Sequence, residues 1–282
     1  MRKGRPSLTA ERVAIERAAH QIIDSPVIFV DPLAMRVIDP AAAAKLQSHP
    51  EEHRRQPLRR RIRALAVVRS RIAEDEIARA AARGVSQYVV LGAGLDTFGC
   101  RPDLPSVRVF EVDHPATQQL KRERLAAAGI AVPDRLTFAP CDFDRESASE
   151  ALARVGFDRS RPAVFAWLGV TMYLEERAVF EMLRFIASLP TETSVIFDYA
   201  LPVRSFTGRG RWWYRLGVLR MAWRGEPWTA FFEPASMRVE LTQMGFREVD
   251  DLTNDDVNRR YLAGRQDGLF AGTPTVIAVA RL

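Results

Sequence analysis

One short stretch of the chain, Gln87–Thr97, reads as a buried strand that runs directly into a glycine turn and an acid. Tyr88–Leu91 is an apolar run rich in β-branched residues, which is typical of a strand covered on both faces of a parallel sheet. Gly92 and Gly94 then allow the backbone to turn sharply and to approach a ligand closely. This pattern predicts an α/β fold with a ligand site at the carboxyl edge of its sheet.

The turn differs from the dinucleotide-binding fingerprint. Thr97 occupies the position of the third glycine in that fingerprint. Asp96 lies in the same turn, where a carboxylate would repel a pyrophosphate and suit a cationic ligand such as a sulfonium amino acid. Asp96 can alternatively cap the helix that follows. The turn by itself therefore favours a ligand other than a dinucleotide.

Acids also follow the next two predicted strands. Val107–Asp113 ends on a carboxylate, and Asp113 lies 19 residues after Gly94 (113 − 94), close to the roughly 20-residue offset of an acid that binds ribose. Arg135–Pro140 is followed by Asp142, which taken alone can be a turn residue. Three successive strands that end in a glycine turn or an acid indicate one ligand site at the sheet edge.

Several motifs together resemble the leucine carboxyl methyltransferase-like family, whose members are S-adenosylmethionine (SAM)-dependent and have the class I fold. The matching segments are Arg17–Asp24, Asp31–Ala34, Leu91–Thr97, Phe110–Pro115, Gly169–Leu174 and Arg259–Arg265. They follow the family order over nearly the whole chain. The sequence is most similar to the bacterial branch of the family, to which some polyketide O-methyltransferases are also similar. The resemblance implies SAM as cofactor and a doubly wound, mostly parallel seven-stranded Rossmann-like sheet.

The resemblance also implies roles for individual residues. Gly92 and Gly94 would line the methionine part of SAM, and Asp113 would bind the ribose hydroxyls. Asp142 would accept a hydrogen bond from the adenine amino group, and Phe143 would donate an adjoining backbone N–H. With Asp96 from the turn argument, these residues form the predicted cofactor site.

Arg69 completes this site. It lies within the apolar stripe of a predicted helix, whereas Arg71 points to the opposite face. The stripe is formed by Leu58, Ile62, Leu65 and Ile72. A buried guanidinium needs a partner, which can be a protein acid or the carboxylate of a bound amino acid. The resemblance favours the second choice, because Arg69 matches the family arginine that binds the SAM carboxylate.

One position departs from the family pattern, and three others are expected at the substrate wall. Many relatives carry a glutamate just before the Gly169–Leu174 motif, where this chain has Leu168. A contact from that acid to the SAM amino group is therefore not expected here. Tyr173 from the same motif, and Tyr261 and Arg265 from the last motif, are predicted to line the acceptor site.

The chain divides into two predicted regions. Residues 1–84 are expected to form an N-terminal helical cap, in which Met1–Arg5 is disordered and the first helix ends at Pro26. The apolar stripe of that helix is expected to comprise Ile15, Ala18, Ala19 and Ile22. Residues 85–282 are expected to form the SAM-binding core, whose last strand (275–280) runs antiparallel as in the family. Within the core, Pro234 should start a helix that Gly245 ends.

A tryptophan-rich segment, residues 201–233, interrupts the alternation of strands and helices. Its tryptophans are Trp212, Trp213, Trp223 and Trp228. We interpret the segment as a helical lid over the site, because long insertions in compact domains are often functional. A pair of helices packed through their aromatic side chains is the alternative.

Composition limits the other possibilities. The net charge of +6 comes from arginines spread along helices, with a dense cluster at Arg54–Arg63 that lacks interleaved aromatics, so we expect no nucleic-acid partner. No apolar run approaches the roughly 20 residues that cross a bilayer, so no membrane partner is expected. The two cysteines fit a reducing cytoplasm. The four histidines show no metal-ligand spacing, and His20 is expected to be structural.

These observations predict a SAM-dependent methyltransferase that acts on an oxygen of a small molecule, either a carboxylate or a phenol or other hydroxyl. A non-catalytic SAM-binding module and a nicotinamide-dependent dehydrogenase are the alternatives. No side chain in the strand-end motifs stands out as a general base. His114 is the one histidine there, and its place before Pro115 indicates a helix start.

Overall fold

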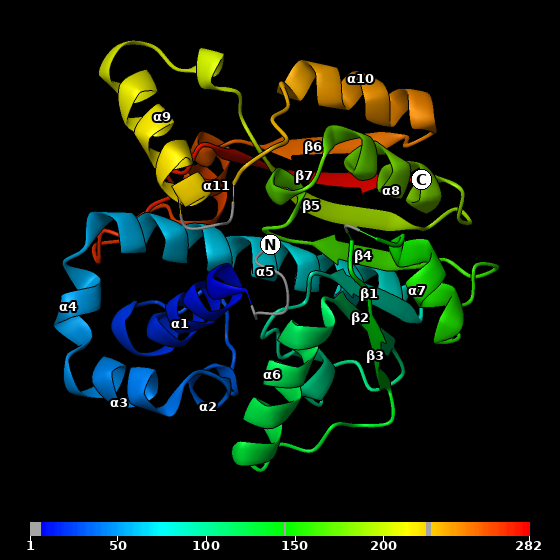
Figure 1. The fold of residues 1–282 in the computed structure, drawn as a ribbon, viewed down its shortest axis with the longest axis horizontal. Helices are drawn as coiled ribbons and strands as arrows, with labels where there is room; N and C mark the ends of the chain where they lie inside the picture. Colours follow the sequence, from blue (N-terminus) through cyan, green and yellow to red (C-terminus); the bar gives the residue numbers. More distant parts are fainter. Residues whose placement is uncertain (1–6, 144, 224–226) are drawn as a thin grey trace.

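The computed structural model describes residues 7–143, 145–223 and 227–282. In this part of the chain, a seven-stranded sheet in the order β3-β2-β1-β4-β5-β7-β6 lies between two layers of helices (Figure 1). The strands are β1 (Gln87–Leu91), β2 (Arg108–Asp113), β3 (Leu136–Pro140), β4 (Val164–Trp167), β5 (Ser194–Ala200), β6 (Glu248–Leu252) and β7 (Thr275–Arg281). The segment Met1–Arg5, expected to be disordered, lies outside the described residues.

The pairing of the strands confirms the predicted doubly wound sheet. β1 pairs in parallel with β2 on one side and with β4 on the other, so the strand order reverses between β1 and β4. β2–β3 and β4–β5 are also parallel, whereas β7 runs antiparallel to both β5 and β6, as predicted. In open α/β sheets, ligands bind beyond the carboxyl ends of the strands at such a reversal point.

The helices cover both faces of the sheet. They are α1 (Leu8–Ile23), α2 (Ala34–Val37), α3 (Pro40–Ser48), α4 (Pro50–Arg54), α5 (Pro57–Ala82), α6 (Pro115–Ala127), α7 (Ala148–Arg154), α8 (Glu176–Ala187), α9 (Gly208–Trp223), α10 (Pro234–Met244) and α11 (Asn254–Tyr261). Side chains alternate along β1, so that Val90 packs in the core with α1 and α5, while Val89 packs in the core with α7, α8 and α10. Both faces of this strand are therefore buried.

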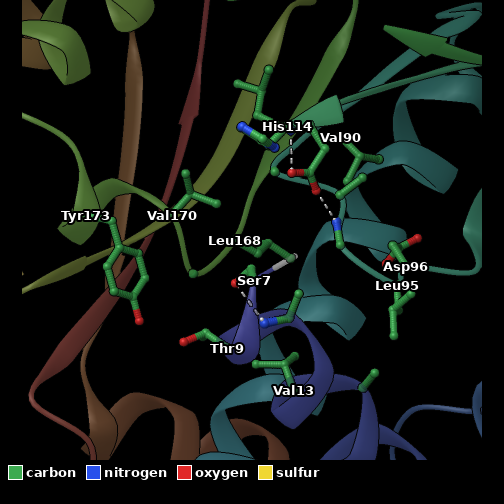
Figure 2. A pocket seen from close by; sticks show the side chains of 18 of the residues that line it. Ser7, Thr9, Val13, Val90, Leu95, Asp96, His114, Leu168, Val170 and Tyr173 are labelled. Atoms are coloured by element: carbon green, nitrogen blue, oxygen red, sulfur yellow. Dashed lines mark hydrogen bonds between the residues drawn. The ribbon is translucent and has the colours of Figure 1, made fainter. Parts of the chain in front are cut away.

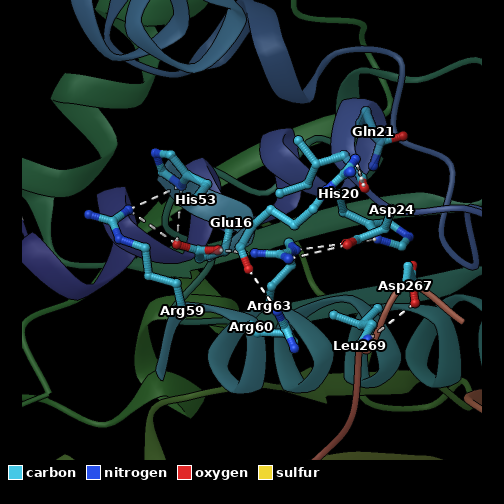
Figure 3. Close-up of polar contacts among 12 residues, drawn as sticks. Glu16, His20, Gln21, Asp24, His53, Arg59, Arg60, Arg63, Asp267 and Leu269 are labelled. Atoms are coloured by element: carbon cyan, nitrogen blue, oxygen red, sulfur yellow. Dashed lines mark hydrogen bonds and ion pairs between the residues drawn. The ribbon is translucent and has the colours of Figure 1, made fainter. Parts of the chain in front are cut away.

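The N-terminal helices bury polar side chains that an apolar pattern overlooks. Ala18 and Ala19 are buried as predicted, but Ile22 and Leu58 are exposed, which corrects the two predicted stripes. Arg63 of α5 is instead buried, and it donates to Glu16 of α1 and to Asp24, the residue that follows α1 (Figure 3). A buried ion pair can occupy a core position when both charges are satisfied, and periodicity of apolar residues does not register it.

His20 belongs to the same buried network, as its position near the apolar stripe predicted. Its Nδ1 lies 2.8 Å from Asp24, and its Nε2 accepts a hydrogen bond of 3.0 Å from the backbone N–H of Ile28. The histidine thus fastens α1 to the loop that follows it (Figure 3). This confirms a structural role for the side chain.

Two helix boundaries follow the predicted start and stop signals. The side chain of His114 accepts from the N–H of Ala116 and caps α6, which begins at Pro115. Pro234 begins α10, and Gly245 ends it with a left-handed φ of 109°.

The sequence allowed either a helical lid or a packed pair of helices in residues 201–233. The described part of this segment contains one α-helix, the 16-residue α9. Tyr214 on α9 packs against Phe206 and Trp228, with ring centroids 4.8 Å and 6.3 Å apart. After α9, the N–H of Thr229 donates to the carbonyl of Met172 at 2.7 Å. The segment is therefore fastened to the core at its C-terminal end. The side chain of Trp213 lies outside the described residues.

Candidate functional site

A cavity of about 190 Å³ lies at the carboxyl ends of the central strands (Figure 2). Its lining comes from seven segments: the start of α1, Arg69 and Ser70 on α5, the glycine turn after β1, Asp113 and His114 after β2, Asp142 and Phe143 after β3, the loop Leu168–Leu174 after β4, and Pro227. The predicted residues at three strand ends are thus brought together in one place.

The glycine turn is packed tightly between β2 and the loop after β4. The N–H of Gly92 donates to the carbonyl of Val112 at 2.7 Å, and Gly92 and Gly94 have positive φ angles of 67° and 53°. A Cβ atom at Gly92 would lie 2.4 Å from Cγ2 of Val170. Glycine is therefore required at this position by both its backbone conformation and its surroundings.

Asp113 is bound to the glycine turn. One carboxylate oxygen accepts from the N–H of Gly94 at 2.5 Å, and the other accepts from the N–H of His114 at 2.6 Å. Burial raises the pKa of Asp113, and the two backbone hydrogen bonds oppose that rise. A carboxylate offers about four lone-pair sites, so Asp113 retains acceptor capacity toward the cavity.

Asp96 is paired with an arginine from the first helix. Arg17 of α1 donates to Asp96 and to Asp31, each at 2.7 Å. Burial alone would raise the pKa of Asp96, but the charge of Arg17 holds it at about 2. Asp96 also accepts from the N–H of Phe98 at 2.8 Å, which closes a local turn. The 3-10 helix that follows, Phe98–Cys100, has Thr97 as its N-cap residue and no side-chain capping hydrogen bond, so the capping alternative is not observed.

This ion pair corrects the electrostatic argument made from the turn alone. The charge of Asp96 is largely compensated by Arg17, so it is not a free acid facing the ligand. Arg17 lies on the buried side of α1, in the segment Arg17–Asp24 that resembles the family. Sequence reasoning did not predict this contact, because residues 17 and 96 are 79 positions apart.

Arg69 is buried and lines the cavity, whereas Arg71 is exposed and pairs with Asp75. This confirms which of the two arginines points inward. Nη1 of Arg69 donates to Asp198 on β5 at 2.8 Å, and the other oxygen of Asp198 accepts from the N–H of Gly169 at 2.5 Å. The structural ion pair is thus present. Binding of a ligand carboxylate by the rest of the guanidinium stays a prediction.

Asp142 and Phe143 line the cavity at the end of β3. Arg145, three residues along the chain, lies 3.6 Å from the Asp142 carboxylate. The contacts of Asp142 and Phe143 with adenine stay a prediction.

The opposite wall is formed by the loop after β4. Leu168, Val170 and Tyr173 line it, so the position of the family glutamate carries an apolar side chain here (Figure 2). Tyr261 and Arg265 do not line the cavity. Arg265 donates to Asp267 and to the carbonyl of Pro26, and Tyr261 packs against the core near α11.

The start of α1 was not predicted as part of the site. Ser7, Thr9, Ala10 and Val13 close one side of the cavity, and the Ser7 hydroxyl accepts from the N–H of Ala10 at 3.2 Å (Figure 2). Their small size permits α1 to approach the glycine turn closely, since a Cβ at Gly94 would lie 3.0 Å from Cβ of Ala10.

The described residues contain no group of three or more His, Cys, Asp or Glu side chains arranged to hold a metal ion. None of their helices combines the length and the apolar character that crossing a membrane requires.

Comparison with known proteins links this geometry to one family. The family model described as "Leucine carboxyl methyltransferase" matches residues 10–187. A Bacillus subtilis protein named "Putative S-adenosyl-L-methionine-dependent methyltransferase" is 33% identical over 295 residues, which cover 96% of this chain and 96% of that protein. A Mycobacterium tuberculosis protein of the same name is also 33% identical, over 64% of this chain and 60% of its own length.

Solved structures agree on the fold. A DUF574 family protein from Streptomyces avermitilis has a TM-score of 0.58 at 18% identity, covering 95% of this chain and 96% of that chain. A Thermobifida fusca protein described as a methyltransferase has a TM-score of 0.56 at 16% identity, covering 99% of this chain and 96% of that chain. At these identities, the similarity supports the fold alone.

Proposed function

Because this chain belongs to the leucine carboxyl methyltransferase family and is a SAM-dependent methyltransferase, we propose that it methylates an oxygen atom of a small-molecule acceptor. The membership removes the dehydrogenase alternative. The observation that carries the proposal is the cavity itself, in which a guanidinium, two strand-end carboxylates and a glycine turn face an apolar wall.

The donor and acceptor groups of the cavity fit the parts of SAM. Arg69 is suited to its carboxylate, Asp113 to the ribose hydroxyls, and Asp142 to the adenine amino group. Gly92 and Gly94 allow the methionine part to approach the backbone. When bound, SAM would supply an electrophilic methyl group, which would pass to the acceptor oxygen as the carbon–sulfur bond breaks and the neutral thioether leaves.

The residues of this chain contribute mainly by position. Holding two reactants in the right geometry can lower the activation free energy by roughly 7–11 kcal/mol. The start of α1 covers one side of the cavity, and Val170 and Tyr173 form the other wall, so an acceptor would be held between these two walls. We propose Tyr173 as a residue of the acceptor wall.

His114 is poorly placed to act as a general base. Its Nδ1 accepts the N–H of Ala116, so the neutral ring carries its proton on Nε2 and has no free lone pair. Removing a proton from an acceptor would therefore require the ring to give up its role as cap of α6. We propose that the acidity of the acceptor itself governs the rate.

This argument favours an acceptor that is already ionised. A carboxylic acid, with a pKa near 4, is deprotonated at neutral pH, whereas a phenol, near 10, would need a base or a lowered pKa. A carboxylate is thus our first candidate. A phenol is the second candidate, supported by the apolar wall of Leu168 and Val170.

The pH dependence of turnover tests the proposal. With a set of carboxylic and phenolic acceptors and saturating SAM, we expect a carboxylate to give a rate that is flat from about pH 6 to 9, and a phenol to give a rate that rises with pH. His114→Ala should lower the rate by only a few-fold. A loss of about 100-fold or more with SAM affinity intact would show that His114 is a general base. Methylation confined to nitrogen or sulfur acceptors would contradict O-methylation.

A further inference from the structure

The outer face of α9 carries a continuous apolar stripe exposed to solvent. Trp212, Leu216, Leu219 and Trp223 follow each other at spacings of four, three and four residues, which places them on one side of the helix. Their exposed fractions are 63%, 39%, 56% and 89%. Large apolar side chains gathered in this way on one face mark an interaction site.

A different face of α9 attaches the helix to the protein. The Tyr214 hydroxyl donates to the carbonyl of Leu201 at 2.6 Å, and its ring contacts Phe206 and Trp228. Tyr214 lies two residues from Trp212 and from Leu216, so its side chain points away from the stripe. The most exposed members of the stripe are Trp223, Trp212 and Leu219.

The segment that contains α9 is rich in arginine. Six arginines and no Asp or Glu occur between Tyr199 and Gly225. They are Arg204, Arg209, Arg211, Arg215, Arg220 and Arg224. Arg211 and Arg215 are exposed and immediately precede Trp212 and Leu216, so they form a row along the edge of the stripe. A partner for this face must be both apolar and anionic.

We propose that α9 docks on the surface of an anionic phospholipid bilayer. The stripe would lie at the boundary between headgroups and acyl chains, with the exposed Arg211 and Arg215 on the lipid phosphates. Trp212 and Trp223 suit this depth, because tryptophan is enriched at membrane–water interfaces. The helix lies on the membrane and does not cross it, in keeping with the absence of a spanning helix among the described residues.

Charge argues against a second copy of the chain as the occupant. A two-fold contact through α9 would bring the arginines of both copies into one interface, where like charges repel. The bilayer proposal also revises the expectation from hydropathy that the chain has no membrane partner. Averaging hydropathy along the sequence detects segments that span a bilayer, but it does not detect a helix that buries only one of its faces in the bilayer.

Flotation of the full-length protein with lipid vesicles tests the proposal. We expect binding to vesicles of phosphatidylcholine with phosphatidylglycerol, and none to vesicles of phosphatidylcholine alone. The double variant Leu219→Gln/Trp223→Gln should bind the anionic vesicles at least roughly tenfold more weakly, since two apolar side chains no longer enter the bilayer. Arg211→Gln/Arg215→Gln should weaken binding by roughly fivefold per charge.

A matched control is available on other helices. Leu58 on α5 and Val239 on α10 are exposed by 68% and 54%, so Leu58→Gln/Val239→Gln removes comparable apolar surface elsewhere and should leave vesicle binding unchanged. Unchanged SAM affinity of all variants in calorimetry would verify their folding. Binding that survives Leu219→Gln/Trp223→Gln, or no binding to anionic vesicles, would overturn the proposal. So would a dimer in vesicle-free solution that this variant abolishes.

Discussion

Two neighbouring arginines on α5 differ in their surroundings, although they are only two residues apart. Arg69 is buried beside the cavity, and Arg71 pairs with Asp75 at the surface. We predict that Arg69→Lys weakens SAM binding by about 1.5–3 kcal/mol, because lysine retains the charge but cannot contact Asp198 and a ligand carboxylate through one planar fork. Arg71→Lys should change the free energy of SAM binding by less than about 0.5 kcal/mol. Equal effects in calorimetry would contradict the assignment.

Asp113 offers a second test at the scale of single residues. Asp113→Ala should weaken SAM binding by about 1.5–3 kcal/mol if charge-assisted hydrogen bonds to the ribose are lost. Because Asp113 also accepts from Gly94, Asp113→Asn is the better control, since it retains a carbonyl oxygen for that N–H and should lose less affinity. Unchanged affinity in the alanine variant would exclude Asp113 from the cofactor site.

A buried pair outside the cavity makes stability depend on pH. Glu111 on β2 accepts from Lys121 on α6 through Oε2, while its Oε1 has no hydrogen-bond partner among the described residues. Burial raises the pKa of Glu111 from 4.5 to about 7, and Lys121 opposes the rise. Because the folded-state pKa is the higher one, the stability from this group is complete below the unfolded value of 4.5 and is lost as pH rises through about 7.

Lys121→Met should therefore destabilise the protein in a pH-dependent manner. Above the pKa of Glu111, the variant leaves a buried carboxylate without its partner, at a cost of about 3–5 kcal/mol in the free energy of unfolding. At pH 5 the loss should be smaller, because Glu111 is protonated there. Glu111→Gln/Lys121→Met should recover most of the loss. Urea unfolding at pH 5 and pH 8 provides the measurement, and equal losses at the two values would be inconsistent with this account.

Residues at strand ends were predictable from the sequence, whereas their partners were not. Asp113 and Asp142 followed from the position of acids after apolar runs, which is local information. The pairing of Arg17 with Asp96, and of Arg69 with Asp198, joins residues 79 and 129 positions apart. Such pairs depend on how the helices pack, and a single sequence does not determine that packing.

At the scale of elements, α9 and the chain after it are expected to respond to the cofactor. Pro227 lines the cavity, and Thr229 is fastened to Met172, so ligand binding can order the segment from its C-terminal end. We predict that amide exchange in residues 208–233 slows when SAM or its demethylated product binds. The start of α1 should slow with it. Helix α10, which contributes no residue to the cavity lining, serves as the internal control. Exchange that is identical with and without ligand would make the segment a static insertion.

The helices were predicted less completely than the strands. α10 and α6 carry clear start signals, Pro234 and Pro115, and both begin there. α1 was predicted as a helix, but its inward face was misread at Ile22, because Glu16, Arg17 and His20 occupy the buried side. α9 breaks the usual pattern for a related reason, since apolar residues occur on two of its faces and leave no single polar side.

For the whole molecule, the alternation of apolar strands and helices was enough to predict the parallel sheet, whereas its antiparallel last strand was expected from the resemblance to the family. The cavity was predicted at the correct edge of the sheet, with lining residues from the strand ends and from α5. The start of α1, which also lines the cavity, was not predicted, because more than 80 residues separate it from the glycine turn in the sequence. The N-terminal helices share a hydrophobic core with the sheet, so they pack as part of the same body.

The position of β7 has a consequence for the order in which the protein is made. β7 lies between β5 and β6 and is the one described strand with which β6 pairs. β7 follows every other strand of the sheet in the chain, so it is synthesised after them. Until β7 is available, β5 has an unpaired edge and β6 has no neighbouring strand. Folding during synthesis can complete the cofactor half of the sheet early, but closure of the sheet must wait for residues 275–281. A messenger truncated just before that point would yield a nascent chain with two unpaired edges, which is a substrate for chaperones and proteases.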